Sequence, residues 1–380
     1  MVQIWKRIDT LNHFLAGDIG GTKTRLAVIE VSGTQARVVH EVAYQSRDYA
    51  AFEALLGDFL SGIETPSRSA FGIAGPVQGR VAQTTNLPWC IDADVLQRQF
   101  GFAHCTLLND LAATAYGLPA LGADDLLTLQ AGVPNASGNA AVIAAGTGLG
   151  EAGLFWDGYH HQPFATEGGH ASFSPGDELE IAFLRHMGET TDRTTSHLTN
   201  PAKNAGQVIG YSHSTKLQKT AAKSLVIRQQ HQHVSWERVV SGMGLLNLHK
   251  FLCLHRHVAA PQWLMKEMHS GDAAAAISAA ALSGRDEICV ETLAWFVRLY
   301  GAEAGNLALK VMSRGGLYLG GGIAPKILPL LQNGAFLDAF LNKGRMRPLL
   351  EAMPVKVILN DRAALFGAAL YAAQLADDTR

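Results

Sequence analysis

A glycine-rich turn with a carboxylate in front of it is the first stretch suited to binding a phosphate. Residues 13–30 form two apolar runs joined by the turn Gly20-Gly21-Thr22, and Asp18 stands just before that turn. The glycines let backbone N–H groups converge on an anion, and Thr22 adds a hydroxyl donor. Asp18 is placed to hold a phosphate-bound Mg²⁺ through water. The alternative is a tight β-hairpin that needs glycine only for its φ angles, and the stretch alone favours neither interpretation.

Asn109 and Asp110 form a polar pair at the end of an apolar run. Residues 106–108 predict a strand, and residues 111–118 predict a helix that begins directly after the pair. Ligands of open α/β sheets bind beyond the carboxyl ends of strands, which makes the pair a candidate binding site. The alternative is a helix N-cap, which both residue types favour. By itself the pair fits the cap better.

Residues 140–155 repeat the arrangement of the first turn, with Gly146-Thr147-Gly148 between two apolar runs. Two such hairpins are suited to hold the two ends of a polyphosphate. A third glycine turn, Gly320-Gly321-Gly322, lies between a predicted strand and a helix that begins near Pro325. Such a turn lets a flat ring or a phosphate approach the backbone.

Glu167 and His170 flank two glycines in residues 166–173. A carboxylate and an imidazole in a loop can hydrogen-bond a polyhydroxylated ligand. The alternative is that His170 is a solvated loop residue. The neighbouring carboxylate makes the two interpretations equally good.

Strands and helices alternate along the 380 residues, which predicts an α/β protein long enough for two domains. Residues 286–311 predict a long, buried helix. Residues 189–234 are rich in Thr, Ser, Gln, Asn, Lys and His, which indicates a polar insertion, mobile or partly helical.

Composition excludes several classes of protein. A formal net charge of −2 provides no general field for nucleic acid or an anionic membrane, and no apolar run has the length of a membrane span. The four cysteines are far apart, which predicts free thiols in a reducing cytosol rather than a zinc knuckle or a disulfide framework. The N-terminal residues lack a signal-type apolar stretch, so we expect a cytoplasmic protein.

Three common nucleotide and hydrolase motifs are also missing. The first turn lacks the spacer of a Walker A motif, no Rossmann G-x-G-x-x-G follows a first strand, and no G-x-S-x-G elbow occurs.

Taken together, the motifs resemble those of bacterial glucokinases in the hexokinase/actin/Hsp70 superfamily. Seven stretches match in family order and span nearly the whole chain: Gly17–Thr22, Thr85–Trp89, Leu108–Asp110, Gly146–Gly150, Glu167–His170, Glu237–Gly242 and Gly320–Ile323. An ordered set is more specific than any single motif, and it reverses the preference for the helix cap at Asn109-Asp110.

The resemblance implies a two-domain, actin-like ATPase (ribonuclease H-like) α/β fold, with duplicated mixed sheets flanked by helices and an interdomain cleft. A small domain would comprise residues 1–115 and 358–380, with the first phosphate loop and the catalytic Asp. A large domain, residues 116–357, would hold the second phosphate loop, the adenosine site and the polar insertion.

The resemblance also implies a role for each matching residue. Asp110 would be the catalytic base, and Asp18 would bind Mg²⁺ through water. The glucose-binding residues would be Asn109, Asp110, Glu167, His170 and Glu237. The ATP-binding residues would be Gly17, Asp18, Ile19, Gly20, Gly21, Thr22, Gly146, Thr147, Gly148, Gly320, Gly321 and Gly322.

The expected activity is ATP-dependent phosphorylation of glucose to glucose 6-phosphate with Mg²⁺, the first step of glycolysis. Phosphoryl transfer needs positioning and charge neutralisation above all, which backbone amides and Mg²⁺ supply. The alternatives are a non-catalytic sugar sensor of the same fold and a kinase for another hexose, such as mannose or glucosamine. Expected partners are glucose and ATP, without nucleic acid or membrane. A homodimer is common in such folds, but the sequence does not decide it.

The chain departs from the family pattern in three places. Lys23 stands where relatives usually have an uncharged polar residue, and the insertion before Glu237 is longer than the usual turn. The cysteine-rich zinc motif of the related ROK kinases is missing, so the sequence predicts no structural zinc.

Overall fold

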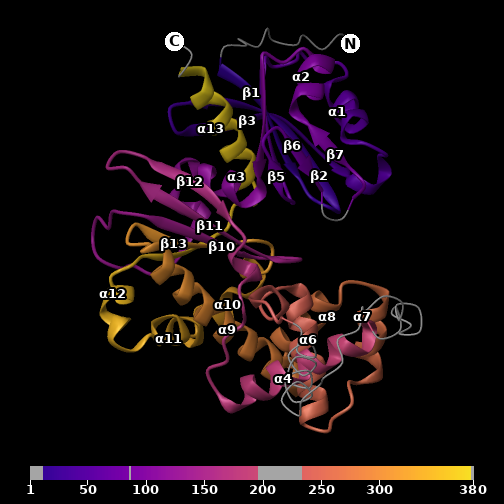
Figure 1. Ribbon diagram of the computed structural model, residues 1–380, viewed down its shortest axis with the longest axis vertical. Helices are drawn as coiled ribbons and strands as arrows, with labels where there is room; N and C mark the ends of the chain where they lie inside the picture. Colours follow the sequence, from indigo (N-terminus) through magenta and orange to yellow (C-terminus); the bar gives the residue numbers. More distant parts are fainter. Residues whose placement is uncertain (1–11, 85–86, 196–232, 378–380) are drawn as a thin grey trace, which may run out of the picture. The chain divides into compact units, whose positions relative to one another are not determined.

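The computed structural model describes residues 12–84, 87–195 and 233–377 (Figure 1). The chain forms two compact units: the first comprises Met1–Gly146, Gly150–Gly168 and Val297–Arg380, and the second comprises Thr147–Leu149 and Gly169–Phe296. The predicted boundary between a small and a large domain stays a prediction. Most of the predicted polar insertion, residues 196–232, lies outside the described residues, and its first residues belong to helix α4 (Glu178–Thr195).

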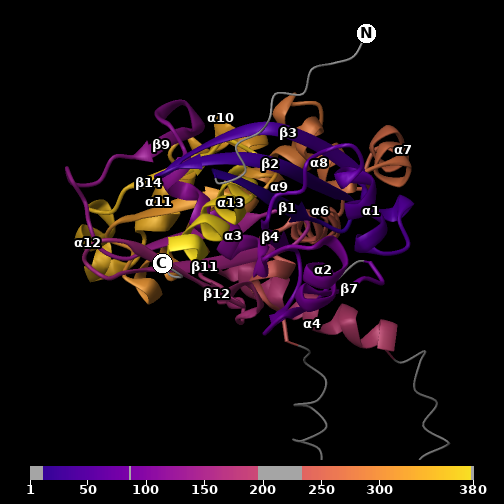
Figure 2. The ribbon, with the colours of Figure 1, turned by 90° about the horizontal axis from the view of Figure 1, so that it is seen from above.

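The first sheet of the first unit is mixed. Its spatial order is β3 (Gln35–Gln45), β2 (Lys23–Ser32), β1 (His13–Ile19), β4 (Arg68–Ile73) and β8 (His104–Asn109). Strands β1 and β2 form the predicted hairpin, with Asp18 opposite Arg25. Strands β1, β4 and β8 are parallel, and β3, β2, β1 and β4 follow one another in Figure 2. A small sheet is formed by β5 (Val77–Gln78), β6 (Val81–Gln83) and β7 (Cys90–Asp92).

The second sheet repeats this strand order. It runs β12 (His161–Thr166), β11 (Leu149–Trp156), β10 (Ala140–Ala145), β13 (Gly316–Gly320) and β14 (Val355–Ile358), with β9 (Leu126–Gln130) at the edge. In both sheets a three-strand meander is followed by two strands that are parallel to its first strand. The predicted fold class, with duplicated mixed sheets flanked by helices, is confirmed.

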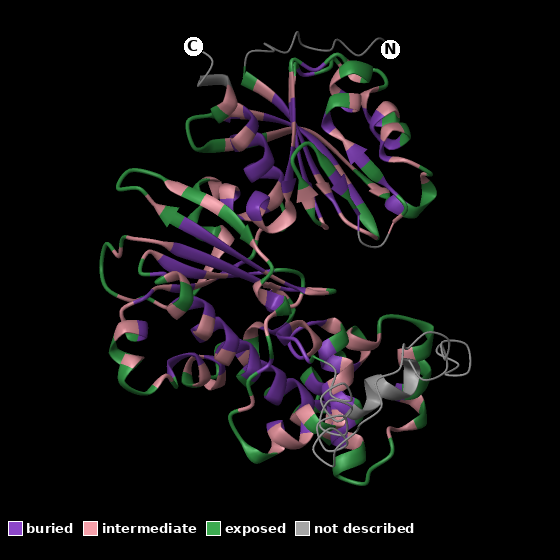
Figure 3. Ribbon diagram, viewed as in Figure 1, coloured by how far each residue is buried: buried purple, intermediate pink, exposed green. Residues whose placement is uncertain are grey.

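Side chains of β1 alternate between the two faces of the first sheet, as expected for a strand buried on both sides. Leu15 and Ile19 pack with α1 (Phe52–Leu60) and α2 (Ala93–Phe100), whereas Phe14 and Ala16 pack against α13 (Ala363–Asp377). These side chains are almost completely buried. Figure 3 shows buried residues along the strands of the first sheet. Helices therefore cover both faces and leave the strand ends to carry polar groups.

Helix α3 (Asp110–Gly117) crosses α13 at backbone contact distance. A Cβ atom at Gly367 would overlap the carbonyl oxygen of Ala113, and one at Gly117 would overlap that of Ala363. Small residues are required here because the two backbones touch. Helix α3 also packs its Ala115 against Val142 and Leu154, so it contacts both sheets of the first unit.

The same three residues, Leu-Asn-Asp, stand at the carboxyl ends of corresponding strands of the two sheets. In the first sheet they are residues 108–110, at the end of β8; in the second they are residues 359–361, directly after β14. A helix follows in both cases, α3 in the first and α13 in the second.

The second unit is largely helical, with α4, α6 (Gly242–His255), α7 (Gln262–Ser270), α8 (Ala273–Leu282) and the first part of α9 (Glu287–Val311). Its aromatic core includes Phe183, Phe251 and Trp295. The remaining helices of the first unit are α10 (Leu328–Leu331), α11 (Ala335–Leu341) and α12 (Arg347–Glu351). Among the described residues, no helix is both long enough and apolar enough to span a membrane.

Candidate active site

The parallel strands of the first sheet end in register, and this places the two predicted aspartates at one edge. Ile19 of β1 lies opposite Ile73 of β4, which in turn lies opposite Asn109 of β8. Close packing fixes the edge, because a Cβ atom at Gly72 would come within 2.9 Å of the Ala113 Cβ atom. The carboxyl ends of β1 and β8 therefore bring Asp18 and Asp110 into the same electrostatic environment, in which the Asp18 charge raises the pKa of Asp110.

The first predicted phosphate loop is held from one side by Ser46. The Ser46 hydroxyl donates to the Gly20 carbonyl at 2.8 Å, and the Ser46 N–H donates to the Thr22 carbonyl at 2.9 Å. The Gly20 N–H donates to the Lys23 carbonyl at 3.1 Å. Ser46 is fully buried, and sequence reasoning missed it because only the fold brings the end of β3 to this turn.

The preference for glycine at position 20 comes from a close backbone contact and not from a positive φ angle. The Gly20 backbone is outside the left-handed region, and a Cβ atom would lie 3.0 Å from the Lys23 carbonyl oxygen. Lys23 itself is exposed at the start of β2. Its charge lowers the pKa of Asp18, although burial and Arg25 have larger effects on that carboxyl.

The structure shows a helix cap at the Asn109-Asp110 pair, although the ordered motifs reverse the preference for one. Asn109 is the N-cap of α3, because its Oδ1 atom accepts from the N–H groups of Leu111 at 3.0 Å and Ala112 at 3.3 Å. The Asp110 Oδ1 atom also accepts from the Leu111 N–H, at 2.9 Å. Burial, followed by the charges of Asp18 and Glu167, raises the pKa of Asp110 to about 6, against the opposing effect of that hydrogen bond. Asp110 is therefore suited to accept a proton near neutral pH.

The charges of Asp18 and Glu167 both act on Asp110 at this edge of the first sheet, although the oxygen atoms of the three carboxylates do not all lie within 4.8 Å of one another. Burial is the main cause of the raised pKa of Asp18, and Arg25, opposite it on β2, opposes that rise. Asp18 and Glu167 both disfavour ionisation of Asp110. These side chains offer oxygen donors, which Mg²⁺ prefers, so the chemistry of this edge fits a Mg²⁺ that enters with a polyphosphate.

The second sheet presents a corresponding edge made of glycines. Gly321 has φ +80°, and a Cβ atom there would overlap the Ala145 carbonyl oxygen at the end of β10. The Ile323 N–H donates to that same carbonyl at 3.2 Å. By contrast, a Cβ atom at Gly146 or Gly322 would meet nothing within 4 Å. Gly321 is therefore packed against the end of β10, whereas the positions of Gly146 and Gly322 are open. The open positions would let a ligand approach the backbone.

The expected helix at Pro325 needs a correction. Residues Ala324–Ile327 form a 3₁₀-helix, and only the single turn of α10 follows it. Pro325 and Pro329 both occupy first-turn positions of these two short elements, where their missing N–H groups cost nothing. One continuous helix would instead place Pro329 in its interior, where proline removes a backbone hydrogen bond, so the segment is divided in two.

The glycine that follows Glu167 packs against Glu151. A Cβ atom at Gly168 would overlap the Glu151 Oε2 atom, and the Gly168 N–H donates to the Thr166 hydroxyl at 3.2 Å. The Thr166 hydroxyl donates to the Glu151 carbonyl at 2.9 Å. Glu167 itself is exposed. The loop is fixed through its neighbours, and the Glu167 side chain reaches solvent.

In the second unit, two segments far apart in the sequence bring His170 and Glu237 together. The Phe173 N–H donates to the Val234 carbonyl at 2.8 Å, and the Trp236 N–H donates to the Ala171 carbonyl at 3.0 Å. His233, which the sequence does not predict as a sugar-site residue, places its Nε2 atom 2.8 Å from the His170 carbonyl oxygen. His170 precedes Ala171 and Glu237 follows Trp236, so both predicted sugar-binding residues adjoin the same end of this short antiparallel pairing.

Glu237 also contacts the second glycine turn. Its Oε2 atom accepts from the Leu149 N–H at 3.1 Å, and a Cβ atom at Gly148 would overlap that oxygen. Ser241, the N-cap of α6, donates from its hydroxyl to the Glu237 carbonyl at 2.5 Å. Glu237 therefore links a predicted sugar contact to a predicted phosphate loop.

Comparison with known proteins gives one consistent family. The family model described as Glucokinase matches residues 15–200 and 204–375. A glucokinase of Nostoc punctiforme is 40% identical over 375 residues, covering 95% of this chain and 99% of the relative. A glucokinase of Synechocystis is 35% identical over 387 residues, covering 95% of this chain and 98% of the relative.

Solved structures agree with this result. A glucokinase from an Antarctic psychrotroph has a TM-score of 0.74 at 28% identity, and the match covers 96% of this chain and 99% of that one. A ROK family glucokinase from Streptomyces griseus, in complex with glucose and AMPPNP, has a TM-score of 0.59 at 20% identity, and the match covers 95% of this chain and 99% of that one. The second likeness concerns the fold alone.

Proposed function

The chain belongs to the glucokinase family of ATP-dependent sugar kinases, and we propose that it transfers the γ-phosphate of ATP to the 6-hydroxyl of glucose. The products would be glucose 6-phosphate and ADP, as in the first step of glycolysis. The observation that supports this most directly is the position of Asp110: a carboxyl at the carboxyl end of β8, with a pKa that burial and the charge of Asp18 raise to about 6.

Asp110 is the proposed general base. The 6-hydroxyl must lose its proton as the bond to phosphorus forms, and a carboxylate within hydrogen-bond reach accepts it. Asn109, Glu167, His170 and Glu237 are the proposed partners of the remaining hydroxyls. A site that hydrogen-bonds several hydroxyls rejects sugars that lack one of them, because a buried polar group would then be left unpaired.

The two glycine turns are proposed to bind the polyphosphate through backbone N–H groups. Gly17 to Thr22 would contact one end and Gly146 to Gly148 the other, with Gly320 to Gly322 against the adenosine. Asp18 would hold Mg²⁺ through water, and the ion would neutralise charge that develops on the phosphoryl group. Cytoplasmic location and a homodimer stay predictions.

A substrate panel tests the proposal. Purified chain is incubated with Mg-ATP and, separately, glucose, mannose, glucosamine and fructose, and formation of ADP and sugar phosphate is followed. We expect the highest kcat/KM with glucose. A higher value with another hexose would replace glucose as the substrate, and glucose binding without ADP formation would favour a non-catalytic sensor.

A further inference from the structure

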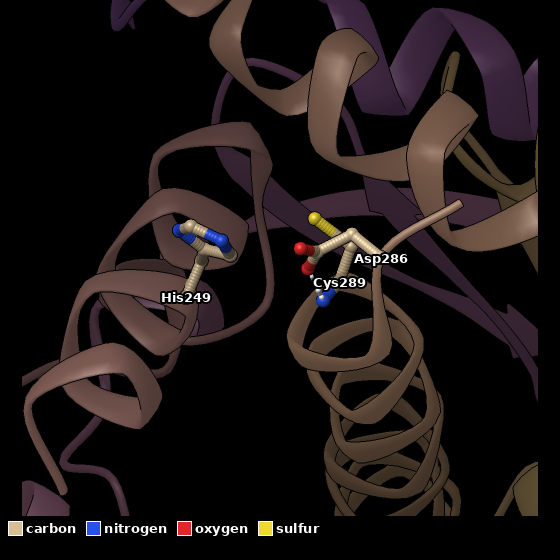
Figure 4. Close-up of side chains that lie close together, drawn as sticks. All are labelled: His249, Asp286 and Cys289. Atoms are coloured by element: carbon tan, nitrogen blue, oxygen red, sulfur yellow. Dashed lines mark hydrogen bonds between the residues drawn. The ribbon is translucent and has the colours of Figure 1, made fainter. Parts of the chain in front are cut away.

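A buried cluster of metal-binding side chains lies in the second unit, apart from the residues discussed above. His249 is on α6, Asp286 directly precedes α9, and Cys289 is in the first turn of α9 (Figure 4). Cys253 lies one turn after His249 on α6. Candidate ligand atoms of His249, Asp286 and Cys289 all lie within 4.8 Å of one another. Within the described part of the chain, no other group of three or more such side chains meets this spacing.

We propose that His249, Cys253, Asp286 and Cys289 bind one zinc ion. Cys253, one helical turn after His249, is proposed as the fourth ligand: its Sγ atom lies 3.8 Å from the His249 Nε2 atom and 3.9 Å from the Nδ1 atom, outside the group of three that lies within 4.8 Å. The sequence predicts no structural zinc, since it lacks any closely spaced cysteine pair. The cluster instead comes from two helices whose residues are more than thirty positions apart.

The donor set selects the metal. One imidazole nitrogen, two thiols and one carboxylate suit Zn²⁺, whereas Mg²⁺ and Ca²⁺ require mostly oxygen ligands. Each coordinating thiol would release its proton to water as its bond to zinc forms. Four protein ligands fill a tetrahedral site, which indicates a structural rather than a catalytic ion.

The geometry needs only small adjustments. Ligand atoms around tetrahedral zinc lie roughly 3.3–3.8 Å apart, as follows from metal–ligand distances of about 2.0–2.3 Å. His249, Asp286 and Cys289, already within 4.8 Å of one another, reach this spacing by side-chain rotation, and Cys253 must turn its thiol toward Asp286 and Cys289 from its position beside His249. The backbone is fixed, because the Asp286 Oδ1 atom accepts from the Cys289 N–H at 2.8 Å and so caps α9.

Burial matches a structural site with an entry path. His249 is 2% exposed and Cys289 is 0% exposed, whereas Cys253 and Asp286 are partly exposed. Zinc would enter past the partly exposed ligands and become enclosed by the buried ones. The bound ion would fasten α6 to α9, and α6 begins at Ser241, which is hydrogen-bonded to Glu237.

Zinc content and affinity of the untagged, full-length chain test the proposal. The protein is stripped with a chelator under reducing conditions, titrated with Zn²⁺ against a chromogenic chelator, and analysed for metal. We expect about one tightly bound zinc per chain. Cobalt(II) should give a thiolate-to-metal charge-transfer band.

Matched variants separate coordination from folding. Asp286→Asn keeps a good helix cap but removes the charged ligand, and Asp272→Asn changes the corresponding cap of α8. Cys289→Ser is matched by Cys105→Ser, another buried thiol. We expect the ligand variants to bind zinc at least about tenfold more weakly, since even outer-shell changes cost roughly 10–100-fold, and the matched variants to bind as wild type.

Two results would overturn the proposal. One is a stripped wild-type chain that takes up no zinc in competition with the chelator. The other is equal zinc affinity of the wild type and Cys289→Ser, with the cobalt band unchanged.

Discussion

The two Leu-Asn-Asp segments have the same sequence but different surroundings. In the first, the Asn109 side chain caps α3, and Asp110 lies near the carboxylates of Asp18 and Glu167. In the second, Asn360 donates from its Nδ2 atom to the Asp125 Oδ1 atom at 3.0 Å. Asp361 forms an ion pair with Arg25 at 2.9 Å, and its side chain is 73% exposed.

The difference shows that partners, rather than local sequence, decide what a strand-end carboxylate can do. Asp110 is desolvated among like charges, so its pKa rises to about 6 and it becomes a usable base. The side chain of Asp361 is 73% exposed and forms an ion pair with a guanidinium, so it lacks the burial that is the main cause of the raised pKa of Asp110.

The largest expected effect comes from removing the charge of Asp110. Asp110→Asn should lower kcat roughly 10²–10⁴-fold, the usual contribution of a general base, while glucose binding is largely kept because the amide oxygen still accepts hydrogen bonds. Steady-state kinetics and glucose titration measure the two quantities.

Asp361→Asn is the matched control, with the same change in the same tripeptide. It should alter kcat by less than about threefold, since the side chain of Asp361 is 73% exposed and is not one of the predicted site residues. The pH profile gives a second readout. Wild-type kcat/KM should fall as the pH drops through about 6, where Asp110 becomes protonated. Asp361→Asn should show the same fall in kcat/KM at low pH. Equal losses in both variants would contradict the assignment of Asp110.

The next largest effect is on stability and concerns α3 and α13, the helices that follow the two Leu-Asn-Asp segments. Gly367→Ala would place a methyl group against the Ala113 carbonyl oxygen and force α13 away from α3. We expect a loss of roughly 1–3 kcal/mol in the free energy of unfolding, measured with urea. Gly57→Ala in α1 is the control: its nearest contact would be 4.0 Å away, so alanine should stabilise that helix by up to about 1 kcal/mol.

The smallest effect concerns Glu151 in the second sheet. It occupies the position that Arg25 has in the first sheet, since each follows the first glycine of its turn, Gly146 or Gly20, by five residues. Burial and the neighbouring Glu303 raise the pKa of Glu151 to about 8, and its Oε1 atom is buried without a hydrogen-bond partner. The folded chain therefore holds a proton that the unfolded chain releases above about pH 4.5. Its contribution to the free energy of unfolding must fall as the pH rises from about 4.5 to about 8.

Glu151→Gln should remove that dependence. Between pH 5 and pH 8, we expect the variant to lose less stability than the wild type, by on the order of 1 kcal/mol, in urea unfolding at several pH values. Glu64→Gln, at an exposed carboxylate, should leave the wild-type slope unchanged. A steeper slope in Glu151→Gln would show that the carboxyl is ionised in the folded state.

Local sequence is enough to identify the family and the fold class, and it predicts the places where chemistry is concentrated. Glycine turns after apolar strands have a local cause, because only glycine permits such close approach or positive φ, as at Gly321. The Asn109-Asp110 pair is recognisable for the same reason: a strand end followed at once by a helix start is a local pattern.

The residues that support these groups follow from long-range packing alone. Ser46 reaches the first turn from β3, Arg25 pairs with Asp361 across the chain, and His249 meets Cys289 from another helix. Such contacts depend on strand register and helix packing, which bring distant residues together. The two Leu-Asn-Asp segments differ for the same physical reason. The proton affinity of a carboxyl depends on burial and on nearby charges, and three consecutive residues do not determine either.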